Sequence, residues 1–332
     1  MVVDIKSLGW GIFFKRQLIE SEKTYYPARI SRQNTNNYIL LSEKGSSIGI
    51  LPSKFKEGFK GQLPTVGDWV LVEDVEDMEP DKVTIQRILE RKNLLSRKEI
   101  GEADRQQLMA ANIDRVFIVS GLDGEFNPRK IERYLLLCWS LDLQPAVILN
   151  KKDLVKNSKD AVNQVKTISG DTPILCLSAL NKMGISSLIQ YMKPGSTSIF
   201  LGSSGVGKSS LINLVMGEET FKTGAVRTKD SKGRHTTSFR ELVLTPHDSV
   251  LIDTPGMREI RIWSPDINMN RFQDILALAQ RCKFNDCSHA SEPGCELKLA
   301  EENGIVSSTR LNQFKRLMNE SLQNEFGNQK KY

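Results

Sequence analysis

The sequence predicts a multidomain protein with a small N-terminal β-barrel, a central α/β domain and a C-terminal α-helical domain. Short β-segments separated by turn residues fill residues 8–95. Strands then alternate with helices, and after residue 263 helical patterns surround a cluster of cysteines. A chain of 332 residues has room for two or three domains. We place the domains at residues 1–100, 101–264 and 265–332.

The composition is typical of a soluble globular protein, with 39% hydrophobic and 26% charged residues. No apolar run approaches the ~20 residues that a membrane helix needs. The N-terminus, MVVDIKSLGWGIFF, lacks the basic start and the long apolar core of a secretory signal. We therefore expect a cytoplasmic protein. The net charge of +6 permits nucleic-acid binding without requiring it.

The N-terminal strands are expected in GWGIFFKRQ, YYPARISRQ, NYILLSEKG, GDWVLVEDV and KVTIQRILE. Four to six short strands with frequent Gly, Pro and Asn predict a closed or sandwiched β-domain. An OB-like barrel and an SH3-like barrel both fit this pattern. Residues 54–60, KFKEGFK, interleave aromatic residues with lysines, as loops that contact nucleic acid do, although an ordinary loop with two anchoring rings has the same pattern.

The central domain follows a connector, EADRQQLMAANID. Strands are expected in RVFIVSG, PAVILN, PILCLSA, TSIFLG, FRELVLT and SVLIDT. Helices are expected in PRKIERYLLLCWSLDL, residues 159–168, GISSLIQYM and GKSSLINLVMG. This alternation predicts a mostly parallel sheet that helices cover on both faces.

A phosphate-binding loop lies between the strand TSIFLG and the following helix. The stretch GSSGVGKS fits G-x-x-x-x-G-K-S, in which glycines let backbone N–H groups surround phosphates. Lys208 is expected to neutralise the β- and γ-phosphates, and the Ser209 hydroxyl to bind Mg²⁺. The residues expected to bind nucleotide here are Gly202, Ser203, Ser204, Gly205, Val206, Gly207, Lys208, Ser209 and Ser210.

The stretch VILNKKD predicts guanine recognition, because it ends a buried strand with Asn150, Lys151, Lys152 and Asp153. A carboxylate such as Asp153 can accept hydrogen bonds from both N1–H and the 2-amino group of guanine, and adenine offers no such pair of donors. Ser178 and Ala179 end the next strand and fit the loop whose backbone contacts the guanine O6. These motifs argue against the alternative of an ATPase.

A third motif, Asp253-Thr254-Pro255-Gly256, ends the strand SVLID. Asp253 is expected on the Mg²⁺ side of the nucleotide, and the N–H of Gly256 is expected to sense the γ-phosphate. The motif order is therefore NKxD, SA, phosphate loop, DTPG, whereas a Ras-like GTPase begins with the phosphate loop. The sequence thus predicts a circularly permuted GTPase, which is physically plausible because domain termini often lie close together.

The first switch is expected in residues 217–237. Either Thr236 or Thr237 can bind Mg²⁺ there, and we favour Thr237. Met257 stands where Ras-like enzymes place a glutamine that orients water, so we expect slow intrinsic hydrolysis. His235 is a candidate to replace the glutamine, although a surface histidine in a basic loop fits equally well.

The C-terminal cluster, Cys282-x4-Cys287-x-His289-x5-Cys295, predicts a structural zinc site because three thiolates and one imidazole form a closed tetrahedral shell. Free thiols are the alternative. Cys138 and Cys176 lie in apolar contexts and are expected to be buried. Leu311, Phe314, Met318 and Leu322 recur at helical spacing, which indicates core packing.

These motifs together resemble the RsgA/YjeQ family of circularly permuted GTPases: NKKD, GSSGVGKSS, GRHTT, DTPGMRE and CKFNDCSHASEPGC, with AANID and GDWV. The resemblance covers nearly the whole chain. It implies an N-terminal OB-fold, a GTPase domain and a helical domain whose zinc ligands are Cys282, Cys287, His289 and Cys295. It also implies late maturation of the small ribosomal subunit, with rRNA binding and GTP hydrolysis that the subunit stimulates. We expect a monomer with Mg²⁺ and one zinc ion. A GTP-binding checkpoint or scaffold protein with negligible hydrolysis is the alternative.

Overall fold

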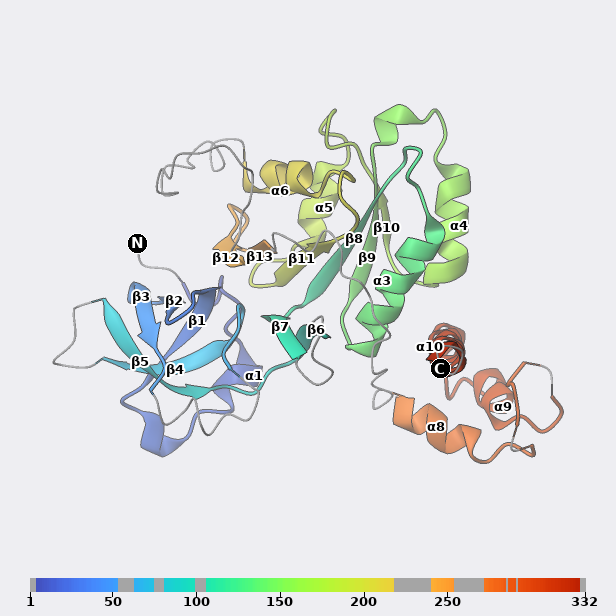
Figure 1. The fold of residues 1–332 in the computed structure, drawn as a ribbon, viewed down its shortest axis with the longest axis horizontal. Coiled ribbons are helices and arrows are strands. Elements are labelled where there is room, and N and C mark those ends of the chain that lie inside the picture. Colours follow the sequence, from blue (N-terminus) through green and yellow to red (C-terminus); the bar gives the residue numbers. More distant parts are fainter. Residues whose placement is uncertain are drawn as a thin grey trace.

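The computed structural model describes residues 4–52, 63–74, 81–98, 106–217, 240–253, 272–284, 286–290 and 292–328. The chain forms a β-barrel, a central sheet with helices around it and a C-terminal group of helices that lies beside α3 and α4 (Figure 1). In this described part of the chain, no helix combines the length and the apolar content needed to span a bilayer.

The barrel consists of β1 (Tyr26–Gln33), β2 (Tyr38–Ser42), β3 (Gly45–Ile50), β4 (Trp69–Asp74) and β5 (Lys82–Ile88). The strands are paired in the order β1-β2-β3-β5-β4, and β4 pairs back to β1. The β3–β5 pairing is parallel and the others are antiparallel. This closed five-stranded barrel confirms the expected OB-like domain, and β3 is a strand that the sequence did not predict.

The prediction of a strand in GWGIFFKRQ is wrong, because this stretch forms α1 (Ile12–Lys15). Its aromatic residues at positions 10, 13 and 14 have helical spacing rather than strand alternation. Phe14 is buried against Trp69 at a ring distance of 5.8 Å, whereas Ile12 is 64% exposed. A short 3-10 turn, η1 (Glu20–Glu22), leads into β1.

The expectation of a plain connector before the central domain is also wrong. Residues within it form β7 (Gln106–Ala111), which pairs with β6 (Leu94–Lys98) in a separate two-stranded antiparallel sheet. The boundary expected after residue 100 falls between these two strands. Asn112, which has a left-handed φ of 58°, then turns the chain into the central sheet.

The central sheet contains β8 (Arg115–Gly121), β9 (Pro145–Asn150), β10 (Ile174–Cys176), β11 (Thr197–Leu201), β12 (Glu241–Leu244) and β13 (Val250–Asp253). Their spatial order is β10-β9-β8-β11-β13-β12, with only β12 antiparallel to its neighbour. β11 lies in the middle of the sheet, between β8 and β13. β12 also pairs antiparallel with β1 of the barrel, where Arg32 lies opposite Glu241 and forms an ion pair with it.

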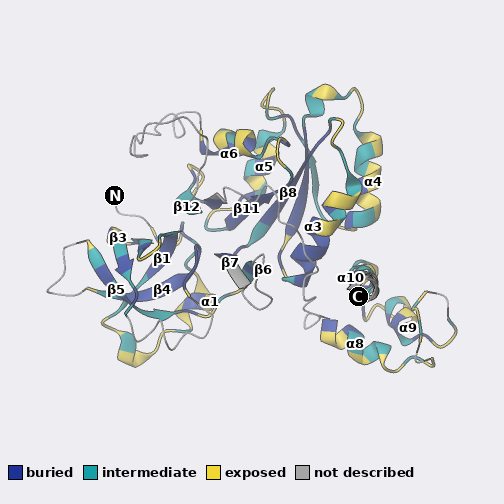
Figure 2. Cartoon of the chain, viewed as in Figure 1, coloured by how far each residue is buried: buried dark blue, intermediate teal, exposed yellow. Residues whose placement is uncertain are grey.

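Helices cover both faces of this sheet, as expected. Val116 and Ile118 of β8 belong to the same buried cluster as α3 (Pro128–Ser140) and α4 (Lys159–Ser169). Phe117 and Val119 point the other way, into the cluster of α5 (Ile185–Tyr191) and α6 (Lys208–Met216). Every residue of β9 and β11 is buried, whereas β10 at the edge of the sheet is half-buried. Figure 2 shows the middle of the sheet mainly in dark blue.

The C-terminal helices are α8 (Gln273–Ala279), α9 (Glu296–Glu302) and α10 (Ser308–Asn328). Leu311 and Phe314 of α10 are buried in the cluster that also contains α3, which agrees with the expected packing role. Arg316 forms an ion pair with Glu132 of α3 and donates to the Thr167 carbonyl of α4 at 2.8 Å. These contacts attach α10 to the α3–α4 face of the central sheet.

Candidate nucleotide-binding site

Asn150 connects two of the predicted motifs. It ends β9, its side chain is 2% exposed, and its Nδ2 donates to the carbonyl of Val206 in the phosphate loop at 2.8 Å. Its Oδ1 accepts from the backbone N–H of Ala179 at 3.0 Å. One amide side chain therefore joins the phosphate loop to the Ser178–Ala179 loop, because the carboxyl ends of parallel strands meet at one edge of a sheet.

Asp153 lies in the 3-10 turn η2 (Lys152–Leu154), directly after β9. Its Oδ1 accepts a hydrogen bond from the hydroxyl of Ser178, which is fully buried. The backbone N–H of Lys152 donates to the Leu177 carbonyl at 3.1 Å, so the turn is also attached to the next strand. These contacts with the neighbouring strand hold the turn and the Asp153 carboxylate in one orientation.

The phosphate loop has the backbone that its glycines predict. Gly202 and Gly207 have φ values of 147° and 95°. A Cβ at Gly207 would lie 2.2 Å from the Asn150 amide nitrogen, so only glycine fits there. The Lys208 ammonium donates to the carbonyls of Gly202 and Ser203 at 2.7 and 2.6 Å. The loop then continues into α6, whose first turn contains Ser209 and Ser210.

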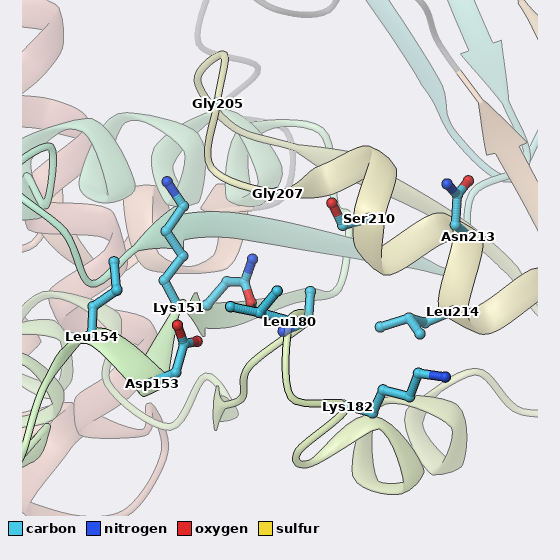
Figure 3. A pocket seen from close by; sticks show the side chains of 12 residues that line it. Lys151, Asp153, Leu154, Leu180, Lys182, Gly205, Gly207, Ser210, Asn213 and Leu214 are labelled. Carbon is cyan, nitrogen blue, oxygen red and sulfur yellow. Dashed lines mark hydrogen bonds between the residues drawn. The ribbon is translucent and has the colours of Figure 1, made fainter.

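These motifs border one cavity of about 840 Å³. Figure 3 shows Lys151 and Asp153 on one side of it and Ser210 on the other, with Gly205 and Gly207 above. The size suits a nucleotide, since ligand pockets span about 300–1,000 Å³. The residues from the predicted motifs that line it are Asn150, Lys151, Asp153, Ala179, Gly205, Gly207 and Ser210.

The cavity also has lining residues that sequence reasoning missed: Leu154, Leu180, Lys182, Asn213 and Leu214. Leu154 directly follows Asp153, and Leu180, which is 80% exposed, directly follows Ala179. Asn213 and Leu214 come three and four residues after Ser210, so helical spacing could have identified them. A further missed residue is Asp123, which forms an ion pair with Lys151.

Among the described side chains, these predicted nucleotide residues do not line the cavity: Lys152, Ser178, Gly202, Ser203, Ser204, Val206, Lys208 and Ser209. Asp253 ends β13, which is parallel to β11 and adjacent to it, so its backbone lies at the same sheet edge as the phosphate loop. The predictions for His235, Thr236, Thr237, Gly256 and Met257 lie outside the described residues. The lysine–aromatic stretch at 54–60 also lies outside them.

The four residues predicted as metal ligands lie together, with all four ligand atoms within 4.8 Å of one another. The Cys282 Sγ is 3.5 Å from His289 Nδ1 and 4.0 Å from Cys295 Sγ, and the Cys295 Sγ is 3.6 Å from the same nitrogen. A tetrahedron with metal–sulfur bonds of about 2.3 Å has edges of about 3.8 Å. The cluster can therefore bind a metal ion.

The other two cysteines differ from each other. Cys138 in α3 is fully buried, and burial raises the pKa of its thiol. Cys176 at the end of β10 is only half-buried, so the expectation of two buried thiols is correct for Cys138 alone.

Comparison with known proteins identifies the family. The family described as RsgA GTPase matches residues 88–263, just over half of the chain. The chain is 37% identical to a protein of Opitutus terrae named small ribosomal subunit biogenesis GTPase RsgA, over 95% of this chain and 89% of that protein. A protein of the same name from Methanosarcina acetivorans is 41% identical over 78% of this chain and 70% of its own length.

The chain belongs to the RsgA GTPase family. The resemblance noted from the motifs is thus confirmed, and the protein is a GTP-hydrolysing enzyme. The crystal structure of YjeQ from Thermotoga maritima has a TM-score of 0.58 and 29% identity, covering 89% of this chain and 98% of that one.

A second structure, YloQ, described as a circularly permuted GTPase, has a TM-score of 0.56, and at 22% identity it shows the fold alone. The predicted permutation is confirmed, since the strands of this RsgA-family domain occur in the permuted order described above.

Proposed function

We propose that this protein binds the small ribosomal subunit and hydrolyses GTP to GDP and phosphate during late maturation of that subunit. The observation that supports this most strongly is the convergence of three motifs on one cavity through Asn150. The relatives' shared name, small ribosomal subunit biogenesis GTPase, supports the choice of partner.

The guanine base would lie at the end of the cavity that Asp153 and Ala179 border. Asp153 would accept from N1–H and the 2-amino group. The backbone N–H of Ala179, which donates to Asn150 Oδ1 in this structure, would be shared with the guanine O6. The phosphates would lie in the glycine loop, where Lys208 would exchange its two carbonyl partners for phosphate oxygens. Ser209 and Thr237 would hold Mg²⁺ with the nucleotide, and Asp253 would lie on the Mg²⁺ side.

The switch residues complete the proposed reaction. Gly256 would sense the γ-phosphate, and His235 would orient the attacking water in place of the missing glutamine. Because Met257 cannot position water, we expect hydrolysis to be slow in isolation and faster on the subunit.

We propose that the cluster of Cys282, Cys287, His289 and Cys295 holds one structural zinc ion. Bound metal would stabilise the short segment between α8 and α9, which has little core of its own. Glu292 shapes the same segment, since it accepts from the backbone N–H groups of Ser288 and Ala290 at 2.8 and 2.9 Å.

We place the domain boundaries at residues 1–100, 101–264 and 265–332, and infer a cytoplasmic monomer that contacts rRNA. The net charge of +6 is compatible with an RNA partner. The barrel supports the same partner, because OB-folds commonly bind oligonucleotides.

A GTPase assay with and without purified small ribosomal subunits tests this function. We expect subunits to raise the rate of GTP hydrolysis, and the matched control is an equal concentration of large subunits. An unchanged rate with bound small subunits would favour the alternative, a GTP-dependent scaffold with negligible hydrolysis, to which Met257 points. Asp153→Asn should weaken the binding of guanine nucleotides specifically. If the variant kept the wild-type preference for guanine over adenine nucleotides, the assignment of the site would be contradicted.

A further inference from the structure

The loop after β8 carries a carboxylate that none of the nucleotide motifs includes. Asp123 forms an ion pair with the ammonium group of Lys151, the second residue of NKKD. The two side chains are 23% and 29% exposed, so the pair is mostly shielded from water. An ion pair in such a setting is screened less than one on the open surface.

The position of Asp123 is determined independently of Lys151. The backbone N–H of Leu122 donates to the Asn150 carbonyl at 2.8 Å, which attaches the start of this loop to the end of β9. The N–H of Glu125 donates to the Asp123 carboxylate at 3.2 Å. A Cβ at Gly121 would lie 2.8 Å from that carboxylate, so the glycine leaves room for it. The acceptor for Lys151 is therefore preorganised.

Lys151 is the residue that needs such a partner. It has a left-handed φ of 64°, and its side chain lines the cavity. In Figure 3 the side chain extends along the cavity away from the carboxylate of Asp153 and toward the level of Gly205. Fixing a long lysine side chain in one conformation costs rotamer entropy. An ion pair at the ammonium end offsets part of this cost and keeps the methylene groups in one place.

We propose that Asp123 is a positioning residue for guanine nucleotides, which holds the Lys151 side chain as an ordered wall of the base-binding end of the cavity. This inference rests on the proposed function, because it requires a guanine nucleotide in the cavity. An ordered row of methylene groups offers a planar base an apolar surface. Since Asp123 acts at the base, it affects GDP and GTP by the same factor.

The test compares Asp123→Asn with Glu125→Gln in the full-length protein. Both variants remove one negative charge from the same loop, but Glu125 is exposed and lends only its backbone N–H to the carboxylate. The dissociation constants for GDP and for a non-hydrolysable GTP analogue are measured by titration. We expect Asp123→Asn to raise both dissociation constants by the same factor, about three- to tenfold. The dissociation constants of Glu125→Gln should stay within about twofold of wild type.

A double-mutant cycle separates positioning from a general structural role. Lys151→Met keeps an apolar side chain and removes the ammonium, so Asp123→Asn should have no further effect on GDP affinity in that background. The same loss in both backgrounds would overturn the inference, and so would unchanged affinity of Asp123→Asn.

If Asp123→Asn fails to fold, Asp123→Glu replaces it, since it keeps the charge. We expect Asp123→Glu to retain more GDP affinity than Lys151→Met, and the reverse order would overturn the inference. If wild-type protein binds no guanine nucleotide, the proposed function fails, which is a different result from a silent Asp123 variant.

Discussion

Replacing Asn150 by alanine should weaken nucleotide binding and also lower the stability of the unliganded protein. The side chain makes two hydrogen bonds, to Val206 at 2.8 Å and from Ala179 at 3.0 Å, and it is 2% exposed. Each such bond contributes about 0.5–1.5 kcal/mol net, so the variant loses about 1–3 kcal/mol. The Val206 carbonyl and the Ala179 N–H would then lose their hydrogen-bond partner at a buried position.

The same loss should appear in affinity, because Asn150 holds the phosphate loop and the Ser178–Ala179 loop together before nucleotide arrives. Without it, binding must itself order the two loops. A cost of about 1–3 kcal/mol corresponds to a decrease in GDP affinity of about 5- to 150-fold. The unfolding midpoint should also fall, by about 2–4 °C for each kcal/mol.

The assay is a GDP titration combined with thermal unfolding without nucleotide. Asn312→Ala is the matched control, since Asn312 has an exposed side chain on α10. The reasoning would be refuted if Asn150→Ala kept both its GDP affinity and its unfolding midpoint within error of wild type. A fall in affinity without any fall in midpoint would show that the two hydrogen bonds contribute nothing before binding.

Three further predictions concern other parts of the molecule. Gly207→Ala should reduce GDP affinity more than tenfold in a titration, because its Cβ would lie 2.2 Å from Asn150 Nδ2 at a φ of 95°. Cys282→Ser should reduce the zinc content measured by mass spectrometry and lower the midpoint of thermal unfolding. The pKa of Asp274 is held below its ordinary value by hydrogen bonds from Arg310, so this pair stabilises the fold above about pH 4 and stops doing so as the pH falls through the lowered pKa. Urea unfolding measures the difference in unfolding free energy between wild type and Asp274→Asn. We expect this difference to be below about 1 kcal/mol at neutral pH, because the pair is partly exposed, and to vanish in acid.

Each of these has a control. Gly205→Ala introduces a side chain at a φ of 78°, and no atom of the described residues lies within 4 Å of the new Cβ, so it should cost less affinity than Gly207→Ala. Equal losses would contradict the steric argument. Cys176→Ser should keep the zinc content of wild type, and loss of zinc there would contradict the ligand assignment. A stability difference for Asp274→Asn that persists unchanged at low pH would contradict the ion-pair explanation.

Local patterns were sufficient for much of the fold. Helices such as α3 and α4 follow from apolar periodicity, and Pro128 begins α3 as a proline in a first turn does. The buried strands β8 and β9 follow from continuous apolar runs. Local patterns failed for α1, where the aromatic run predicts a strand, and for β7, whose place in the fold depends on its pairing with β6.

The sequence by itself determined the chemistry of this protein, because NKKD, the glycine loop and the Cys/His cluster are short and their spacing is local. The order of these motifs also determined the permuted connectivity. Only the tertiary structure decided how they meet: Asn150 reaches a carbonyl 56 residues away, and the barrel closes through the pairing of β1 with β4. The same is true of Asp123, which no motif includes, since its ion pair with Lys151 exists only because β8 and β9 are neighbours in the sheet. Contacts between residues distant in sequence depend on how the strands pair, and that pairing is a property of the whole sheet.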